Sequence, residues 1–163
     1  MIKDALLVEF DHELSTTRRL LERIPDDKLA WKPHDKSRSL GELALHVANL
    51  PNWGPFILER LEFDLRDNPF PISQQPASSA DLLAIFETAR GNARKAMDKT
   101  DAELAALWVL KRNDQELFAL PRLAAFRSFV LNHMIHHRGQ LSVYLRLNDI
   151  PVPAIYGPTA DEG

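Results

Sequence analysis

The sequence predicts an all-α fold, a four-helix bundle with a crossover connection, in a single domain over residues 1–163. Four long segments repeat their apolar residues with helical spacing, and no segment alternates apolar and polar residues clearly enough to predict a strand. A long loop rich in proline and serine separates the second helix from the third, so the helices need not follow a simple up-and-down order.

The first two predicted helices differ in regularity. The first spans about residues 2–24 and ends at Pro25. The second spans about residues 39–65 and begins with SLGE, a capping-box sequence. Pro51 and Pro55 lie in its middle, and because proline lacks an N–H and clashes with the preceding turn, we expect a kink or an interruption there.

The second half of the chain is expected to hold two further long helices. Residues 66–79 form the crossover loop, and the third helix follows over about residues 79–97. Residues 100–120 are ambiguous: TDAELAAL is typical of a short helix, and WVLKRNDQELFAL of an extended or irregular segment. The fourth helix spans about residues 121–147 and starts with a proline. The tail, residues 148–163, contains three prolines and two glycines, so it cannot stay helical for long.

Composition excludes several classes of site. The net charge of −3 argues against the basic face that nucleic-acid binding requires. The chain has no cysteine, so disulfides, zinc–thiolate sites and a cysteine nucleophile are absent, and any thiol chemistry would use the thiol of a bound small molecule. The N-terminus lacks the pattern of a signal peptide, and no segment approaches the roughly 18–20 apolar residues of a membrane span. We therefore expect a cytoplasmic protein with no membrane segment.

Three histidines occupy positions where the helical pattern predicts Leu or Ile. His133 and His137 are four residues apart, so they lie about 40° apart on one helical face, with Cβ atoms roughly 5–6 Å apart. His46 lies on the apolar stripe of the second helix, between Leu43 and Leu50. Three buried imidazoles would each need a polar partner, whereas one cation satisfies all three. The pattern therefore favours a metal site in the bundle core.

A simpler interpretation of each histidine stays open. Histidine pairs at this spacing arise often by chance, and a single core histidine is usually just a hydrogen-bonded buried residue. His12 and His34 look unspecific, and His12 is expected to face solvent. His136 lies at the edge of the apolar stripe of its helix, where a plain rim residue or an acid–base group would fit.

Other polar residues lie near the same helical faces. Gln140 returns to nearly the face of the histidine pair, and Asn49 follows His46 by three residues, so either is a candidate to orient a ligand or a bound water. A helix-surface amide is an equally good interpretation of both. Arg138, followed by Gly139, marks either a close helix approach or an ion pair with a carboxylate, and the sequence does not decide between them.

Two blocks of sequence, WKPHDKSRSLGELALHVANLPNW and the C-terminal run NHMIHHRGQLSVYLRLNDIPVPAIYGPTADEG, carry a more specific signature, which consists of HxxHHRGQ and the upstream core histidine. Together they resemble the DinB-like (DinB/YfiT) family of metalloenzymes. The resemblance covers essentially the whole chain. It implies a four-helix bundle with a crossover, often a homodimer, in which His46, His133 and His137 bind one divalent metal. It also implies one of several activities: thiol-dependent isomerases and S-transferases, or metal-dependent hydrolases.

The expected function is that of a metal-dependent enzyme acting on a small-molecule substrate. Three imidazoles leave coordination positions open, and zinc and nickel both suit them. Such a site would support hydrolysis, or transfer or isomerisation with a low-molecular-weight thiol as cofactor. His136, Gln140 and Tyr156 are candidates to assist catalysis. The alternative is a metal-binding or stress-response binding protein without turnover, and DNA binding is disfavoured by the acidic balance.

Overall fold

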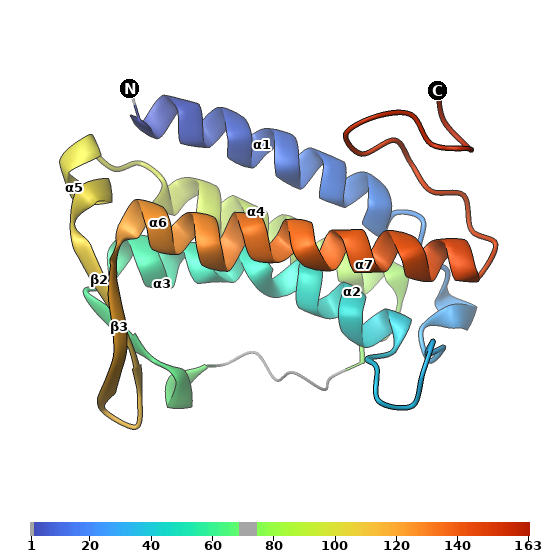
Figure 1. Ribbon diagram of the computed structural model, residues 1–163, viewed down its shortest axis with the longest axis horizontal. Helices are drawn as coiled ribbons and strands as arrows, with labels where there is room; N and C mark the ends of the chain where they lie inside the picture. Colours follow the sequence, from blue (N-terminus) through green and yellow to red (C-terminus); the bar gives the residue numbers. More distant parts are fainter. Residues whose placement is uncertain (1, 69–74) are drawn as a thin grey trace.

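Long helices laid side by side make up the body of the computed structural model, which describes residues 2–68 and 75–163 (Figure 1). The helices are α1 (Ile2–Leu21), α2 (Leu40–Asn49), α3 (Trp53–Glu59), α4 (Ser79–Ala96), α5 (Asp101–Ala105), α6 (Arg122–Phe126) and α7 (His133–Leu147). The predominantly helical prediction is confirmed, and the short helix expected after residue 100 is α5.

The direction of the helices requires a crossover. Helices α1, α6 and α7 run one way along the long axis, and α2, α3 and α4 run the other way (Figure 1). Helix α4 packs against both α2 and α3, so neighbouring helices run parallel and the chain between them has to return along the molecule. The central part of the predicted crossover loop, residues 69–74, lies outside the described residues.

The second predicted helix is interrupted where proline was expected to interrupt it. Helix α2 ends at Asn49, a 3₁₀ turn with Pro51 in its first turn follows, and α3 starts at Trp53. Pro55 is tolerated because it lies in the first turn of α3, whose N–H groups have no helical partner. The predicted extension to about residue 65 was wrong, since α3 ends at Glu59 and an extended segment follows.

A capping box fixes the start of α2, as the sequence predicted. The N–H of Glu42 donates to the Ser39 hydroxyl at 3.1 Å, and the N–H of Ser39 donates to the Glu42 carboxylate at 2.7 Å. Ser39 is fully buried, so this start is held inside the molecule. The phase of α2, and with it the direction of His46, follows from this end.

A small three-stranded sheet corrects the all-α prediction. Strand β1 (Glu62–Asp64) runs parallel to β2 (Leu107–Arg112), and β2 pairs antiparallel with β3 (Gln115–Pro121). Asn113 and Asp114 make the hairpin turn with φ of 52° and 64°, a conformation that Asn and Asp tolerate. The sheet escaped prediction because β1 is short and β3 is largely exposed, so only Trp108 and Leu110 of β2 alternate towards the core.

The fourth predicted helix is one rod with an irregular segment in its middle. A π-helical segment, Arg127–Asn132, joins α6 to α7. π-helical turns inside α-helices shift the face that follows them and often occur at functional sites. His133 is the first residue after this segment, so the π turn sets the direction in which the histidine pair points.

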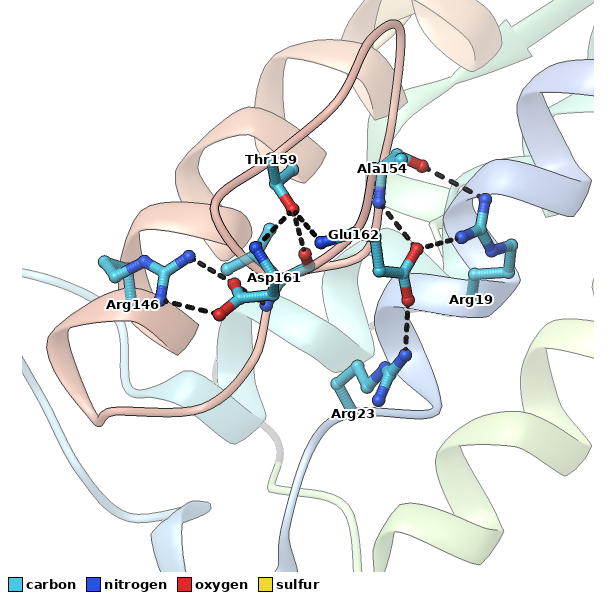
Figure 2. A network of polar contacts seen from close by, with 8 residues as sticks. Arg19, Arg23, Arg146, Ala154, Thr159, Asp161 and Glu162 are labelled. Atoms are coloured by element: carbon cyan, nitrogen blue, oxygen red, sulfur yellow. Dashed lines mark hydrogen bonds and ion pairs between the residues drawn. The ribbon is translucent and has the colours of Figure 1, made fainter.

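The tail folds back over α1 and α7, as Figure 2 shows. The Glu162 carboxylate accepts from Arg19 and from Arg23 of the segment after α1, the latter at 2.6 Å. The Asp161 carboxylate accepts from Arg146 of α7. Backbone N–H groups of the tail also donate to these two carboxylates, Val152 to Asp161 at 2.9 Å and Ala154 to Glu162 at 3.0 Å. None of the described helices has the length and apolar character to cross a membrane.

Candidate metal centre

The three histidines singled out by the helical pattern lie together between α2 and α7. Nε2 of His46 is 3.3 Å from Nε2 of His133, which is 2.9 Å from Nε2 of His137. One ligand atom from each of the three lies within 4.8 Å of the other two. The sequence pattern could suggest, but not show, that one residue of α2 lies against two residues of α7.

Two of the three nitrogen–nitrogen separations are close to those around a single divalent metal ion, and all three ligand atoms lie within 4.8 Å of one another. Zn–N bonds of roughly 2.0–2.1 Å in a tetrahedral arrangement place two nitrogens about 3.3–3.4 Å apart. The His46–His133 separation of 3.3 Å matches this value, and the His133–His137 separation of 2.9 Å is slightly shorter. Within residues 2–68 and 75–163, no aspartate, glutamate or further histidine joins the group. The donor set is therefore three imidazoles, which is typical of catalytic sites with an open position.

The histidines are neutral at pH 7, which is the form that binds a metal. Burial lowers the pKa of His46 to about 3, helped by the positive charge of Arg38. Burial and the neighbouring His137 lower the pKa of His133 to about 4. Burial also lowers the pKa of His137, although its hydrogen bond to Gln140 opposes this. At His46 and His133, a metal would not compete with protons until the solution is strongly acidic.

Gln140 fixes the orientation of the His137 ring. Nδ1–H of His137 donates to the Gln140 side-chain oxygen at 2.7 Å. Because a neutral imidazole carries one hydrogen, its Nε2 then presents a lone pair to the cluster. The sequence proposed Gln140 for an orienting or catalytic role, and this contact is the one that orienting groups make in metal sites.

A pocket of about 280 Å³ opens onto the three histidines. Leu50, Trp53 and Leu65 give it apolar walls, and Arg38 and Asn49 add polar groups. Small-molecule sites have this combination of apolar lining with a few polar groups. The cluster therefore faces a cavity that a small molecule could enter, which a closed structural metal site does not need.

His136 and Tyr156 do not line this pocket. His136 is exposed, with its ring centroid 4.8 Å from that of His137. Tyr156 instead donates to the Glu13 carboxylate at 2.8 Å and accepts from Arg138 at 2.6 Å, so it contacts α1 and α7 away from the pocket lining. His12 is exposed, as the helical pattern predicted, and His34 is also exposed.

Arg138 makes an ion pair, which settles the choice that the sequence left open. Its guanidinium lies 2.7 Å from the Glu13 carboxylate, and both side chains are buried. It also donates to the Glu13 carbonyl and the Thr17 hydroxyl, at 3.0 and 3.2 Å. A Cβ built on Gly139 meets nothing within 4 Å, so this glycine does not mark a close helix approach.

Sequence reasoning missed Arg38, which lines the pocket and directly precedes Ser39, the N-cap of α2. It lies in the charged loop segment HDKSRS, where no periodicity distinguishes one cation from another. Its position directly before a buried N-cap was the one available signal, because that position ties its backbone to the helix that carries His46.

Comparison with known proteins places these features in a family. The model of the DinB family matches residues 1–163. The protein YrdA of Bacillus subtilis (strain 168), which is uncharacterised, is 25% identical, with 98% of this chain and 90% of YrdA aligned. A DinB-like protein from Bacillus cereus ATCC 10987 has a similar structure, with a TM-score of 0.73, 22% identity and coverage of 94% of this chain and 97% of that one. The DinB-like protein YjoA from Bacillus subtilis gives a TM-score of 0.72, 21% identity and coverage of 94% and 99%. At these identities the two structures show the shared fold alone.

Proposed function

The chain belongs to the DinB family, and from its three-histidine cluster we propose that it is a divalent-metal-dependent enzyme acting on a small-molecule substrate. His46, His133 and His137 hold the metal, which is zinc or nickel because imidazole nitrogens suit both. The reaction is hydrolysis, or transfer or isomerisation with a low-molecular-weight thiol. Since the chain has no cysteine, the thiol in the second case comes from a bound molecule.

One observation carries this proposal: three neutral ring nitrogens converge at the wall of a pocket. Imidazoles in this arrangement satisfy part of a tetrahedral shell, and no fourth ligand among the described residues completes it. A bound divalent metal would supply Lewis-acid chemistry there, lowering the pKa of a coordinated water or thiol. An open shell facing a pocket supports catalysis over a purely structural role.

The residues of the chain hold and orient the groups of the site. Gln140 keeps the His137 ring in the tautomer that binds metal, so it is a positioning residue. Leu50, Trp53 and Leu65 keep part of the pocket dry, which strengthens electrostatic interactions inside it. We propose His136 as a proton-exchange group, supported by its exposure beside His137. We assign Tyr156 to the Glu13–Arg138 pair instead of the reaction.

The test is metal-dependent turnover. Metal-free protein is reconstituted with Zn²⁺ or Ni²⁺ and assayed against ester, thioester and amide substrates, and for conjugation of glutathione, bacillithiol or mycothiol to an electrophilic acceptor. The proposal expects turnover that requires the metal and is lost in His133→Ala, while His12→Ala retains it. Full metal occupancy without turnover in any assay would favour the alternative, a non-catalytic metal-binding or stress-response protein.

We also propose a homodimer, on the family resemblance alone. Light scattering coupled to size-exclusion chromatography measures the molar mass directly. A mass near twice 18.5 kDa is expected, and a mass near 18.5 kDa at micromolar concentration would reject the dimer.

A further inference from the structure

We propose that Arg38 is the anion-recognition residue of the metal pocket, and that the substrate carries a carboxylate near the atom that binds the metal. The inference names a substrate class for the proposed function and rests on that function for the presence of the metal. The position, isolation and charge of the Arg38 side chain support it independently.

The Arg38 guanidinium has a buried nitrogen without a partner. In the part of the chain that the structure describes, two buried side-chain nitrogens make no hydrogen bond, Nη1 of Arg38 and Nε of Arg122. Arg122 still donates through Nη2 to the carbonyl of Arg60 at 3.1 Å. Leaving a charged donor buried and unpaired is unfavourable, and such groups are rare in folded proteins, where a bound ion or ligand is one explanation for them. The unmatched donor of Arg38 belongs to a side chain that lines the pocket.

The described lining of the pocket carries no negative charge to balance Arg38. Of its described lining residues, none is an aspartate or a glutamate. A divalent metal on the histidines would add further positive charge. The pocket is therefore electrostatically suited to an anion, which would neutralise charge that the protein leaves unpaired.

The backbone of Arg38 is held against both helices that carry the histidines. The next residue, Ser39, is the buried N-cap of α2. The carbonyl of Arg38 accepts a long hydrogen bond, 3.4 Å, from the hydroxyl of Tyr144 on α7. The backbone of Arg38 therefore has a fixed position relative to the histidine cluster. This fixed position lets its guanidinium recognise a group at a set distance from the metal.

The single charge and planar geometry of the Arg38 guanidinium favour a carboxylate as its ligand. A guanidinium presents a planar fork of donors that matches the two oxygens of a carboxylate. Arg38 is the one arginine or lysine among the described lining residues, so it balances one negative charge. A phosphate dianion would carry a second negative charge that no other arginine or lysine among the described lining residues balances.

The experiment compares two small thiols on Co²⁺-substituted protein. Both 3-mercaptopropionate and its amide, 3-mercaptopropionamide, bind the metal through sulfur, and they differ in the carboxylate. Dissociation constants come from the visible absorption of Co²⁺ for wild type, Arg38→Gln and the exposed control Arg112→Gln. The difference in thiol pKa between the two probes cancels, because the ratio of their constants is compared across the proteins.

Wild type and Arg112→Gln are expected to bind the carboxylate probe more tightly than the amide, and Arg38→Gln to lose roughly tenfold or more of that preference. An unchanged preference in Arg38→Gln would overturn the inference while leaving the metal site intact. Thermal melting of each variant checks that it folds, and Arg38→Lys, which keeps the charge, is expected to restore part of the preference.

A second arm works without metal. Sodium propionate is added to the metal-free protein at constant ionic strength, and the indole N–H signal of Trp53, which lines the pocket, is followed by NMR. A saturable shift in wild type that is absent in Arg38→Gln supports the anion site even if the protein fails to bind Co²⁺, a result that would reject the proposed function alone. A response of equal size in both proteins overturns the role of Arg38.

Discussion

At the scale of single residues, one hydrogen bond decides which nitrogen His137 offers to a metal. With Nδ1–H committed to Gln140, the lone pair of Nε2 points at the cluster. Gln140 itself is exposed, so its contribution to packing is small and its effect on metal binding can be separated from its effect on stability.

Replacing Gln140 with Ala is expected to weaken Zn²⁺ binding about 10–100-fold, because the His137 ring loses its fixed tautomer and orientation. The melting temperature of the metal-free protein should stay unchanged. Competition with a chromogenic chelator measures the affinity, and Gln115→Ala, an exposed glutamine on β3, is the matched control. Equal affinities in the two variants would remove Gln140 from the site.

The sequence predicted some residues of the site and missed others, for a physical reason. His46, His133 and His137 stand out because each replaces an apolar residue in a periodic stripe. Arg38 belongs to a loop without periodicity, and Tyr156 to a tail whose path depends on tertiary contacts. Residues whose positions depend on the folding of a loop leave no such mark in the sequence.

At the scale of elements, backbone irregularities place the site. The break at Pro51 ends α2 one turn after His46, and the π segment before His133 sets the face of α7. The proline could be recognised in the sequence. The π turn could not, because Arg127–Asn132 has no residue that requires one and its geometry depends on packing.

Two glycines in helices give opposite predictions. A Cβ on Gly54 would lie 2.9 Å from the Cβ of Ala93 and 3.2 Å from its Cα, where α3 meets α4. Gly54→Ala should therefore destabilise the protein by about 1–3 kcal/mol. A Cβ on Gly91 of α4 meets nothing, so Gly91→Ala should stabilise by about 0.5–1 kcal/mol. Urea unfolding measures both, and a shift in the same direction for the two would contradict the packing described here.

The buried Glu13–Arg138 pair ties α1 to α7. Replacing Arg138 with Met leaves the Glu13 carboxylate buried without a counter-ion, with the Tyr156 hydroxyl still donating to it, so the free energy of unfolding should fall by about 3–5 kcal/mol. The double variant Glu13→Leu/Arg138→Met should recover much of this loss, because no unpaired charge remains. Urea unfolding measures the free energy of unfolding of both variants. A loss of less than about 1 kcal/mol in Arg138→Met would mean that the pair is not buried in solution.

At the scale of the whole molecule, ion pairs and hydrogen bonds hold the C-terminal tail against the helices. Contacts from Asp161 and Glu162 join residues at the end of the chain to α1, α7 and the segment after α1 (Figure 2). The sequence predicted that the tail is not helical, but these contacts join residues up to 143 positions apart. Local pattern carries no information about such pairs, and the same holds for the pairing of β1 with β2.

The docking of the tail should depend on pH. The hydrogen bond from Arg146 lowers the pKa of Asp161, and that from the N–H of Ala154 lowers the pKa of Glu162. These contacts therefore stabilise the docked tail above the ordinary carboxyl pKa values, about 4, and this stabilisation is lost as the pH falls through the lowered values. Amide hydrogen exchange should show lower protection factors for tail residues in acid, after correction for the intrinsic exchange rate, which itself slows as the pH falls.

The variant Asp161→Asn/Glu162→Gln should show that loss of protection already at pH 7. Asp35→Asn/Glu116→Gln, which changes the same number of charges at exposed positions, is the control. Equal protection of the tail in both double variants would show that the carboxylates do not hold it.

The most direct measurement of the central claim is the metal content of the purified, tag-free protein after incubation with Zn²⁺ or Ni²⁺. Inductively coupled plasma mass spectrometry gives this for wild type, His46→Ala, His137→Ala and His12→Ala. The three-histidine site predicts about one metal ion per chain in wild type and in His12→Ala, and loss of most of it in the other two variants. Equal metal content in all four proteins, or none in wild type, would mean that the three histidines are a polar core and not a metal centre.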